Sequence, residues 1–331
     1  MAPADLKSCA PAGGDASTAE HLIIAFAGCD SPQAAAVVQA LSAQPTSALR
    51  PLLGALQVTA RSHGEADSLS PPHERALAQA LGWPALADGL LPWAAHEAAS
   101  LGLHARGPWG QISLCHWAMG REQASLSDPA LLSISDKESQ ALMADMAPFF
   151  AADGIELHPL RPGVWLAQGE PMALPTASLA RVIGRDVDPW LPAGPEGRLL
   201  RRLQGEMQML LYTHPVNEAR ATRRELPINS LWFSGTGQLP AQAQPGPSVH
   251  LSQELAGPAM AGDWAAYAQA WQSLDAQLLR PLLARLDPGM PLRLTLCGER
   301  GSLSFEPAAR SLMAGLRRLW RRPVWPPKEG L

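Results

Sequence analysis

Apolar and polar residues alternate along the chain in two different periods, which divide it into short strands and longer helices. Short apolar runs bounded by turn residues predict strands at 21–27, 111–116, 130–134, 155–158, 164–168, 230–234, 248–251 and 292–297, with a return strand near 302–305. Apolar positions spaced by three or four predict helices at 31–43, 46–57, 72–82, 89–101, 136–152, 175–184, 197–213, 217–225, 263–286 and 308–321. Strands that alternate with helices favour an α/β fold with a mixed, largely parallel sheet covered by helices.

Two helix boundaries have a local chemical signal. Ser31 followed by Pro32 supplies an N-cap hydroxyl and a proline at the first helical position. Asp153-Gly154 predicts the end of the helix at 136–152, because glycine readily takes the left-handed conformation that closes a helix.

Length and composition suit a globular protein with a core. The chain has 331 residues, of which 47% are hydrophobic and 17% charged. The small and polar residues of 1–20 predict a disordered tail, and the proline-rich 323–331 predicts a terminal tail. Without a composition shift between them, residues 21–322 are predicted to form a single α/β domain.

Charge and cysteine usage restrict the partners and the compartment. A net charge of −4 gives no overall attraction to nucleic acid or to an anionic membrane, so neither is expected as a partner. The apolar run 22–28 is too short to cross a bilayer, and the first residues lack the pattern of a secretory signal. The four cysteines are irregularly spaced, which argues against a zinc knuckle, a redox motif or a disulfide framework and favours a reducing cytoplasm.

The most informative polar residues lie between Arg201 and Gly237. Asn217 is placed to cap a short helix that carries Arg220, Arg223 and Arg224. Asn229 opens the next apolar run, which ends in the glycine-rich segment Gly235-Thr236-Gly237. Backbone N–H groups of such a turn and nearby arginines can hold a phosphate or carboxylate. These residues taken alone favour a structural turn over an anion site, and both interpretations stay open.

Other pairs of reactive residues favour structural interpretations. Cys115 and His116 are neighbours in a predicted strand and point to opposite faces, so they cannot act as a pair. Glu156 and His158 share a face and form either a surface pair or an acid/base pair.

Asp186 and Asp188 lack a third metal ligand and fit a turn, so no metal site is predicted. The predicted helix at 308–321 has a basic face, which favours a docked terminal helix over a lipid or nucleic-acid contact.

Two resemblances to known families arise from these residues. The segments His214-Pro-Val-Asn-Glu-Ala-Arg220, Leu226-Pro-Ile-Asn-Ser230 and Ser234-Gly-Thr-Gly237 resemble a stretch of the archaeal-type cofactor-independent phosphoglycerate mutases. Most of the chain resembles proteobacterial proteins described as RpfE-type regulatory proteins. That resemblance rests on the runs Cys115-His-Trp117, Asp153-Gly-Ile155, Ala177-Ser-Leu-Ala-Arg-Val-Ile-Gly-Arg185 and Gln204-Gly-Glu-Met-Gln-Met-Leu-Leu-Tyr212.

The mutase resemblance implies an alkaline-phosphatase-like fold with two metals and a serine nucleophile, and the ligand pattern departs from it. Asp30 is the one carboxylate that corresponds to the first strand–loop junction of that family. Glu299 and Arg300 stand where the family has an Asp-His pair, and an arginine cannot ligate a metal. The resemblance therefore implies a degenerate fold without the two-metal centre and without a cofactor.

The leading hypothesis is a mutase-like protein that lacks the parent activity and binds a phosphorylated or carboxylated small molecule in a regulatory role. The predicted ligand-binding residues are Asn217, Arg220, Asn229, Gly235, Thr236 and Gly237, with Arg181 and Arg185 as additional candidates. One alternative is an active metal-dependent phosphoglycerate mutase or phosphatase that uses Asp30, Asp186, Asp188, His214 and Glu299. Another is an interaction module that binds a protein partner and no ligand.

Overall fold

The computed structural model describes residues 21–103, 106–121, 123–240, 248–287 and 290–307. The chain forms two compact units. Unit 1 comprises Met1–Ala66, Pro71–Trp83 and Gln244–Leu331, and unit 2 comprises Asp67–Ser70 and Pro84–Ala243. The single domain expected over 21–322 stays a prediction. The predicted tails and the predicted helix at 308–321 lie outside the described residues.

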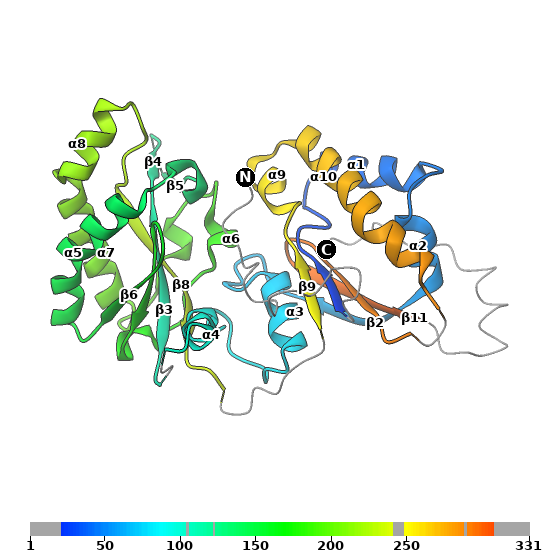
Figure 1. Cartoon of the computed structure of the whole chain (residues 1–331), viewed down its shortest axis with the longest axis horizontal. Coiled ribbons are helices and arrows are strands. Elements are labelled where there is room, and N and C mark those ends of the chain that lie inside the picture. Colours follow the sequence, from blue (N-terminus) through cyan, green and yellow to red (C-terminus); the bar gives the residue numbers. More distant parts are fainter. Residues whose placement is uncertain (1–20, 104–105, 122, 241–247, 288–289, 308–331) are drawn as a thin grey trace. The chain divides into compact units, whose positions relative to one another are not determined.

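Unit 1 is built on a mixed sheet with the order β2-β11-β10-β1-β9 among its described strands (Figure 1). These strands are β1 (His21–Ile24), β2 (Leu56–His63), β9 (Val249–Ser252), β10 (Arg293–Cys297) and β11 (Gly301–Pro307). β1 lies parallel to both β9 and β10, whereas β11 pairs antiparallel with β10 and β2. The buried aliphatic side chains of the central strands, such as Ile23 and Leu294, form its core.

Helices surround this sheet. They are α1 (Pro32–Ala43), α2 (Leu49–Ala55), α3 (Pro72–Ala80), α9 (Ala256–Ala261), α10 (Trp264–Leu274) and α11 (Arg280–Ala284). α3 contacts β1, β9, β10 and β11, and α1 packs against α10. Ser31 caps α1 by accepting a hydrogen bond from the Ala34 N–H, with Pro32 in the first turn, as predicted.

The predicted helix at 263–286 is interrupted by a π-helical turn at Asp275–Leu279. Within this turn Asp275 is buried, and its Oδ1 accepts hydrogen bonds from the Ser47 hydroxyl and from the N–H groups of Ala48 and Leu49. Asp275 thus caps α2 from another helix, because Ala48 at the N-cap position of α2 offers no side-chain oxygen.

Unit 2 has an antiparallel sheet with the order β6-β7-β3-β8 among its described strands. They are β3 (Trp109–Cys115), β6 (Glu156–Arg161), β7 (Val164–Gln168) and β8 (Ser230–Gly237), and β4 (Trp117–Met119) pairs with β5 (Ala124–Leu126) in a small hairpin. The helices are α4 (Trp93–Ser100), α5 (Asp136–Ala152), α6 (Leu179–Val182), α7 (Arg198–Tyr212) and α8 (Pro215–Thr222). Buried residues of α5, α7 and the sheet, among them Met146, Leu203 and Trp165, share one core.

The mixed α/β class is confirmed, with helices flanking a mixed sheet. The expected predominance of parallel pairing is wrong for the described strands, because only β1, β9 and β10 pair in parallel. Sequence alternation cannot distinguish the two pairings when helices separate some strands and hairpins join others. The strand expected at 130–134 is also wrong, because Pro129–Leu132 form a 3₁₀ turn capped by Asp128.

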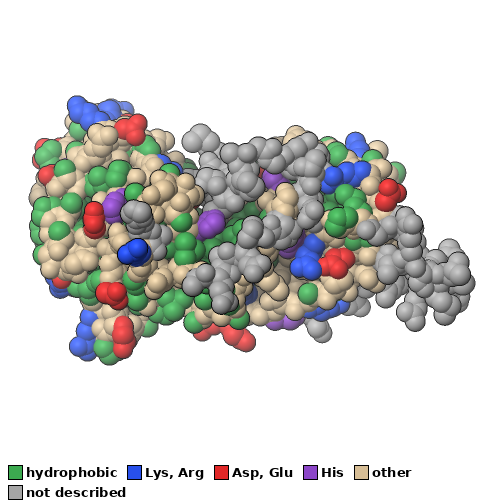
Figure 2. All heavy atoms as spheres, turned by 60° about the horizontal axis from the view of Figure 1, so that its bottom comes forward, with side chains coloured by type: hydrophobic (Ala, Val, Ile, Leu, Met, Phe, Trp, Pro, Cys, Tyr) green, Lys and Arg blue, Asp and Glu red, His purple; other side chains and the backbone are tan. Residues whose placement is uncertain are grey.

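In the described part of the chain, no helix is long and apolar enough to cross a membrane. Figure 2 shows acidic and basic side chains interspersed over one face. This mixed distribution agrees with the modest net charge of −4.

Candidate functional site

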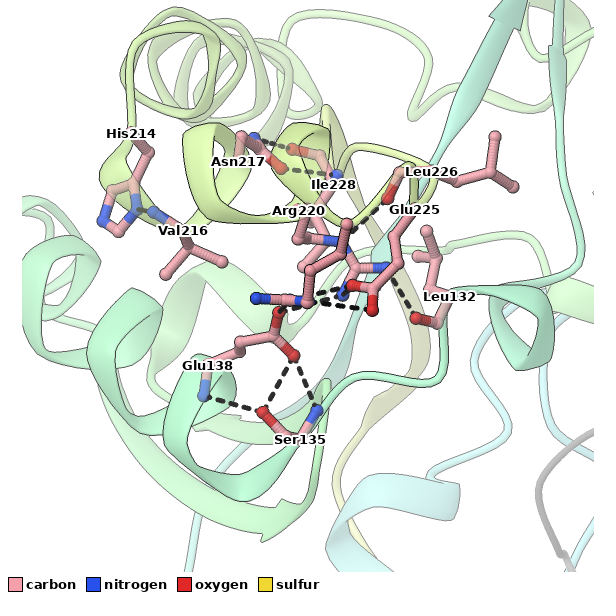
Figure 3. A network of polar contacts seen from close by, with 11 residues as sticks. Leu132, Ser135, Glu138, His214, Val216, Asn217, Arg220, Glu225, Leu226 and Ile228 are labelled. Carbon is pink, nitrogen blue, oxygen red and sulfur yellow. Dashed lines mark hydrogen bonds and ion pairs between the residues drawn. The ribbon is translucent and has the colours of Figure 1, made fainter.

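Arg220, the central predicted ligand-binding residue, is buried among protein acceptors in unit 2 (Figure 3). Its Nε donates to the Leu226 carbonyl at 2.8 Å, and its Nη2 donates to the Leu132 carbonyl at 2.6 Å. Its Nη1 donates to Glu138 Oε1 at 3.1 Å. The guanidinium therefore joins α8 to α5, to the 3₁₀ turn at Pro129–Leu132 and to the loop that follows α8.

Glu138 links this arginine to the start of α5. Ser135 and Glu138 form a capping box, in which the Ser135 hydroxyl accepts from the Glu138 N–H and Glu138 accepts from the Ser135 N–H. Arg223 also donates to Glu138, at 2.7 Å. Burial alone would raise the pKa of Glu138, but the hydrogen bonds from Ser135 and the charge of Arg220 lower it overall.

Asn217 holds the loop that follows α8. Its amide donates to the carbonyls of Leu211 and Ile228, and its Oδ1 accepts from the Ile228 N–H. The predicted N-cap role of Asn217 is wrong, because α8 begins earlier, at Pro215, and is capped by His214. His214 Nδ1 accepts from the Val216 N–H, and its Nε2 donates to Asp145 at 2.9 Å.

Asn229 joins its segment to the start of β4. Its Oδ1 accepts from the Trp117 N–H at 2.7 Å, and its amide donates to the Trp117 carbonyl at 2.9 Å. The Asn229 side chain thus pairs with both backbone groups of Trp117, as the backbone of a neighbouring strand would.

The glycine-rich segment predicted to be a turn belongs to β8. Gly235, Thr236 and Gly237 continue the strand, and the pairing with β3 shifts register between Trp109 and Gln111. Gly235 has φ 61°, and a Cβ there would meet Trp93 Cβ of α4 at 3.2 Å. The glycines therefore allow β8 to be irregular and allow α4 to pack closely against it.

Thr236 and Arg181 are also bound to protein groups. The Thr236 hydroxyl donates to the Leu174 carbonyl at 2.6 Å and contacts the Thr176 hydroxyl at 2.9 Å. Arg181 is buried, donates from Nε to the Ser68 carbonyl at 2.7 Å and lies over the Trp190 ring at 5.2 Å. Arg185 contributes its carbonyl, which accepts from the Leu126 N–H.

The predicted residues therefore form separate groups. Asn217 and Arg220 share the 226–228 loop, whereas Asn229, Thr236 and Arg181 each have a different set of partners. These contacts give all five side chains a structural role. A ligand-binding role for them stays a prediction.

A second group of polar residues lies in unit 1, at the carboxyl ends of its parallel strands. In open α/β sheets this edge is where ligands bind, because loops diverge there from neighbouring strands. The loop after β1 passes through Phe26 at φ 55°, and the Tyr267 hydroxyl of α10 donates to the Phe26 carbonyl at 2.8 Å. Burial, and then the neighbouring Cys29, raise the pKa of Tyr267, which keeps this hydroxyl protonated as a donor.

Asp30, Glu299 and Arg300 meet at this edge. Arg300 Nη2 lies 2.7 Å from Asp30 Oδ2, and the Asp30 N–H donates to Glu299 Oε1 at 3.2 Å. These are the three residues that the mutase resemblance sets against the family's metal ligands, and in the structure they lie close together. The Asp30 carboxylate is occupied by a guanidinium, so this set of side chains does not fit a two-metal centre.

In the residues that the structure describes, no group of three or more His, Cys, Asp or Glu side chains is arranged to hold a metal ion. Asp186 and Asp188 form a local turn, in which the Asp188 N–H donates to Asp186 Oδ1. They belong to unit 2 together with His214, whereas Asp30 and Glu299 belong to unit 1.

Sequence reasoning missed Arg75, which lies on α3 next to the turn between β10 and β11. Its Nη2 donates to the Arg300 carbonyl at 3.2 Å. Helical periodicity placed this arginine in the predicted helix at 72–82 but could not show that its neighbour is more than two hundred residues away. No local motif marks the contact.

No family model matches the chain, and no curated protein matches it. Solved structures that match include a cofactor-independent phosphoglycerate mutase from Thermoplasma acidophilum DSM 1728, at 13% identity and a TM-score of 0.32, over 88% of this chain and 90% of that one. The PH0037 protein from Pyrococcus horikoshii matches at 12% identity and a TM-score of 0.39, over 88% of both chains.

Proposed function

We propose that this protein binds a phosphorylated or carboxylated small molecule in a regulatory role and lacks two-metal phosphoryl transfer. The ion pair between Arg300 and Asp30 at the carboxyl ends of the parallel strands is the observation that supports this best. The proposal moves the anion site from the Arg220 network, where the donors are bound to protein, to this edge.

The edge offers an anion one exposed guanidinium, which lies beside the carboxylates of Asp30 and Glu299. The Arg300 side chain is 53% exposed and carries donors that a phosphate or carboxylate can share. A divalent cation would have to approach Asp30 against this positive charge. Asp30 also lies just before the start of α1, whose N-terminal N–H groups favour a negative ligand.

The regulatory role and the cytoplasmic location are part of the proposal and rest on the sequence. The resemblance to RpfE-type regulatory proteins supports a regulatory function, and the scattered cysteines support a reducing compartment. A protein partner that responds to the bound ligand is compatible with both.

Thermal-shift measurements with inorganic phosphate, 2-phosphoglycerate and 3-phosphoglycerate test the proposal. We expect at least one of these anions to stabilise the protein, and the stabilisation to be lost in Arg300→Gln. Arg50→Gln on α2 changes the net charge by the same amount at an exposed position and should keep the stabilisation.

Elemental analysis and an activity assay address the alternative enzyme. Stoichiometric manganese or zinc in the purified protein, together with phosphoglycerate turnover, would contradict the proposal and favour an active metal-dependent mutase or phosphatase. An absence of stabilisation by any of the anions would also contradict it.

A further inference from the structure

Arg75 is a charged side chain that lies partly buried without a carboxylate partner among the described residues. Its hydrogen bond to the Arg300 carbonyl uses one of its five N–H groups. Its Nε is buried and has no hydrogen-bond partner within the part of the chain that the structure describes. A buried donor without an acceptor costs free energy. An acceptor that hydrogen-bonds to this guanidinium would therefore be bound favourably.

Gly64 and Arg300 fix the position of this guanidinium. The Arg300 carbonyl accepts from the Gly64 N–H at 2.8 Å as well as from Arg75. A Cβ at Gly64 would lie 2.4 Å from Arg75 Nη2 and 2.6 Å from Nη1. Any side chain at this position would therefore displace the guanidinium from the turn between β10 and β11.

Arg75 and Arg300 both belong to this edge of unit 1, because Arg75 donates to the Arg300 carbonyl and the Arg300 guanidinium pairs with Asp30. Arg300 follows shortly after the end of β10 at Cys297, so the hydrogen bond to its carbonyl places Arg75 at the carboxyl end of the parallel strands. Asp30 neutralises Arg300, and Glu299 adds a second carboxylate nearby. These two carboxylates balance the two guanidinium charges, and among the described residues Arg75 is the arginine of the pair that has no ion-pair partner.

We propose that Arg75 and Arg300 form the binding site for a dianionic phosphate, carried either by a phosphate monoester or by free inorganic phosphate. This inference deepens the function proposed above and rests on it. Guanidinium groups bind phosphate through paired N–H donors, and a phosphate has enough oxygens to contact both side chains. A monocarboxylate carries half the charge and competes poorly with Asp30 for Arg300.

Phosphate must compete with Asp30 for Arg300, so the phosphate affinity depends on the charge of Asp30. A bound phosphate takes Arg300 away from Asp30, so the Asp30 carboxylate opposes binding by attraction to Arg300 and by repulsion of the ligand. Asp30→Asn removes both effects and strengthens phosphate binding, whereas the loss of a residue with a merely structural role would not.

Isothermal titration calorimetry of the full chain near pH 8, where the phosphate is a dianion, tests this site. The probes are inorganic phosphate, 3-phosphoglycerate and acetate. We expect both phosphates to bind more tightly than acetate. We expect Arg75→Gln to weaken both phosphates at least tenfold, and Asp30→Asn to strengthen them. Arg50→Gln, matched in charge change, should leave the affinities unchanged.

Gly64→Ala provides a second test that leaves Arg75 itself in place, and it should weaken phosphate binding because the guanidinium is displaced. Tight phosphate binding in folded Arg75→Gln and Gly64→Ala, with loss in Arg300→Gln, would overturn this inference and leave the proposed function intact. Acetate binding as tight as phosphate would overturn the ligand class alone. Absence of binding by all three probes would overturn both proposals.

Discussion

Arg220 is a buried cation whose guanidinium holds three segments of unit 2 through Glu138, Leu132 and Leu226 (Figure 3). Arg220→Ala leaves a carboxylate and two carbonyl groups without this donor. We expect a loss of about 3–5 kcal/mol in the free energy of unfolding, the range found when one partner of a buried pair is removed. Urea denaturation followed by tryptophan fluorescence measures it.

Arg223 provides the control, because it contacts the same Glu138 with a side chain that is 48% exposed. Arg223→Ala should cost about 0–1 kcal/mol, since exposed ion pairs are screened by solvent. Equal losses in the two variants would show that burial does not decide the contribution of Arg220.

His21 predicts how the stability of unit 1 depends on pH. Burial, and then the positive charge of Arg293, lower its pKa to about 4, and its Nε2 contacts the Thr295 hydroxyl at 2.8 Å. In the unfolded chain a histidine takes up a proton at about pH 6.5. Because the folded pKa is lowered, the stabilising contribution is fully present above that pH and is lost as the pH falls towards about 4.

His21→Gln should therefore make the unfolding free energy depend less steeply on pH over this window. The expected difference is about 1.4 kcal/mol for each tenfold change in proton affinity between the unfolded and folded chain. Urea denaturation at a series of pH values measures it, with His63→Gln as an exposed control in the same unit. Parallel pH profiles for the wild type and His21→Gln would refute the assignment.

Among the secondary-structure elements, β8 depends on a glycine that a helix approaches. Gly235→Ala would place a side chain at φ 61° and 3.2 Å from Trp93 Cβ. We expect a loss of roughly 1–2 kcal/mol from the left-handed backbone alone, and more from the contact with α4. Thermal denaturation followed by circular dichroism measures the change.

Gly205→Ala is the matched control, because Gly205 lies inside α7 and a Cβ there meets no atom within 4 Å. Alanine at an open helical position should stabilise by roughly 0.5–1 kcal/mol. Destabilisation in both variants would mean that neither backbone conformation nor packing explains the difference.

Elements with local signals were predictable from the sequence. The capping box of Ser135 and Glu138 and the closing Gly154 enclose α5, and the predicted bounds 136–152 match Asp136–Ala152. β2 was missed because residues from Val58 to His63 are exposed and lack apolar alternation, so the strand forms through its pairing with β11. The segment 235–237 was predicted as a turn because glycine favours turns and irregular strands alike.

The candidate site was predictable only in part, because a sequence shows which residues carry donors and acceptors but not which of them meet. Asp30, Glu299 and Arg300 could be aligned with a known ligand pattern, and they meet in the structure. The arginines near Asn217 suggested an anion site because the sequence shows donors but not their partners. The carbonyl groups of Leu132 and Leu226, which occupy Arg220, are invisible to any motif because every residue has one.

The molecule as a whole divides into two compact units, each with its own sheet and core. Two variants can show whether these units unfold separately. Arg220→Ala perturbs unit 2, and Asp275→Ala removes the buried carboxylate that caps α2 in unit 1. We expect calorimetry to resolve two unfolding transitions. Each variant should lower the midpoint of a different transition, because each loss is confined to one core.

The same experiment tests the single domain predicted from composition. If the chain unfolds as one cooperative domain, the wild type shows one transition, and Arg220→Ala and Asp275→Ala lower it together. Adding phosphate also shows which unit contains the binding site, because a ligand stabilises the unit that binds it. With the site at Arg75 and Arg300, phosphate should raise the transition that Asp275→Ala lowers and leave the other unchanged. A phosphate effect on the Arg220-sensitive transition alone would return the anion site to unit 2.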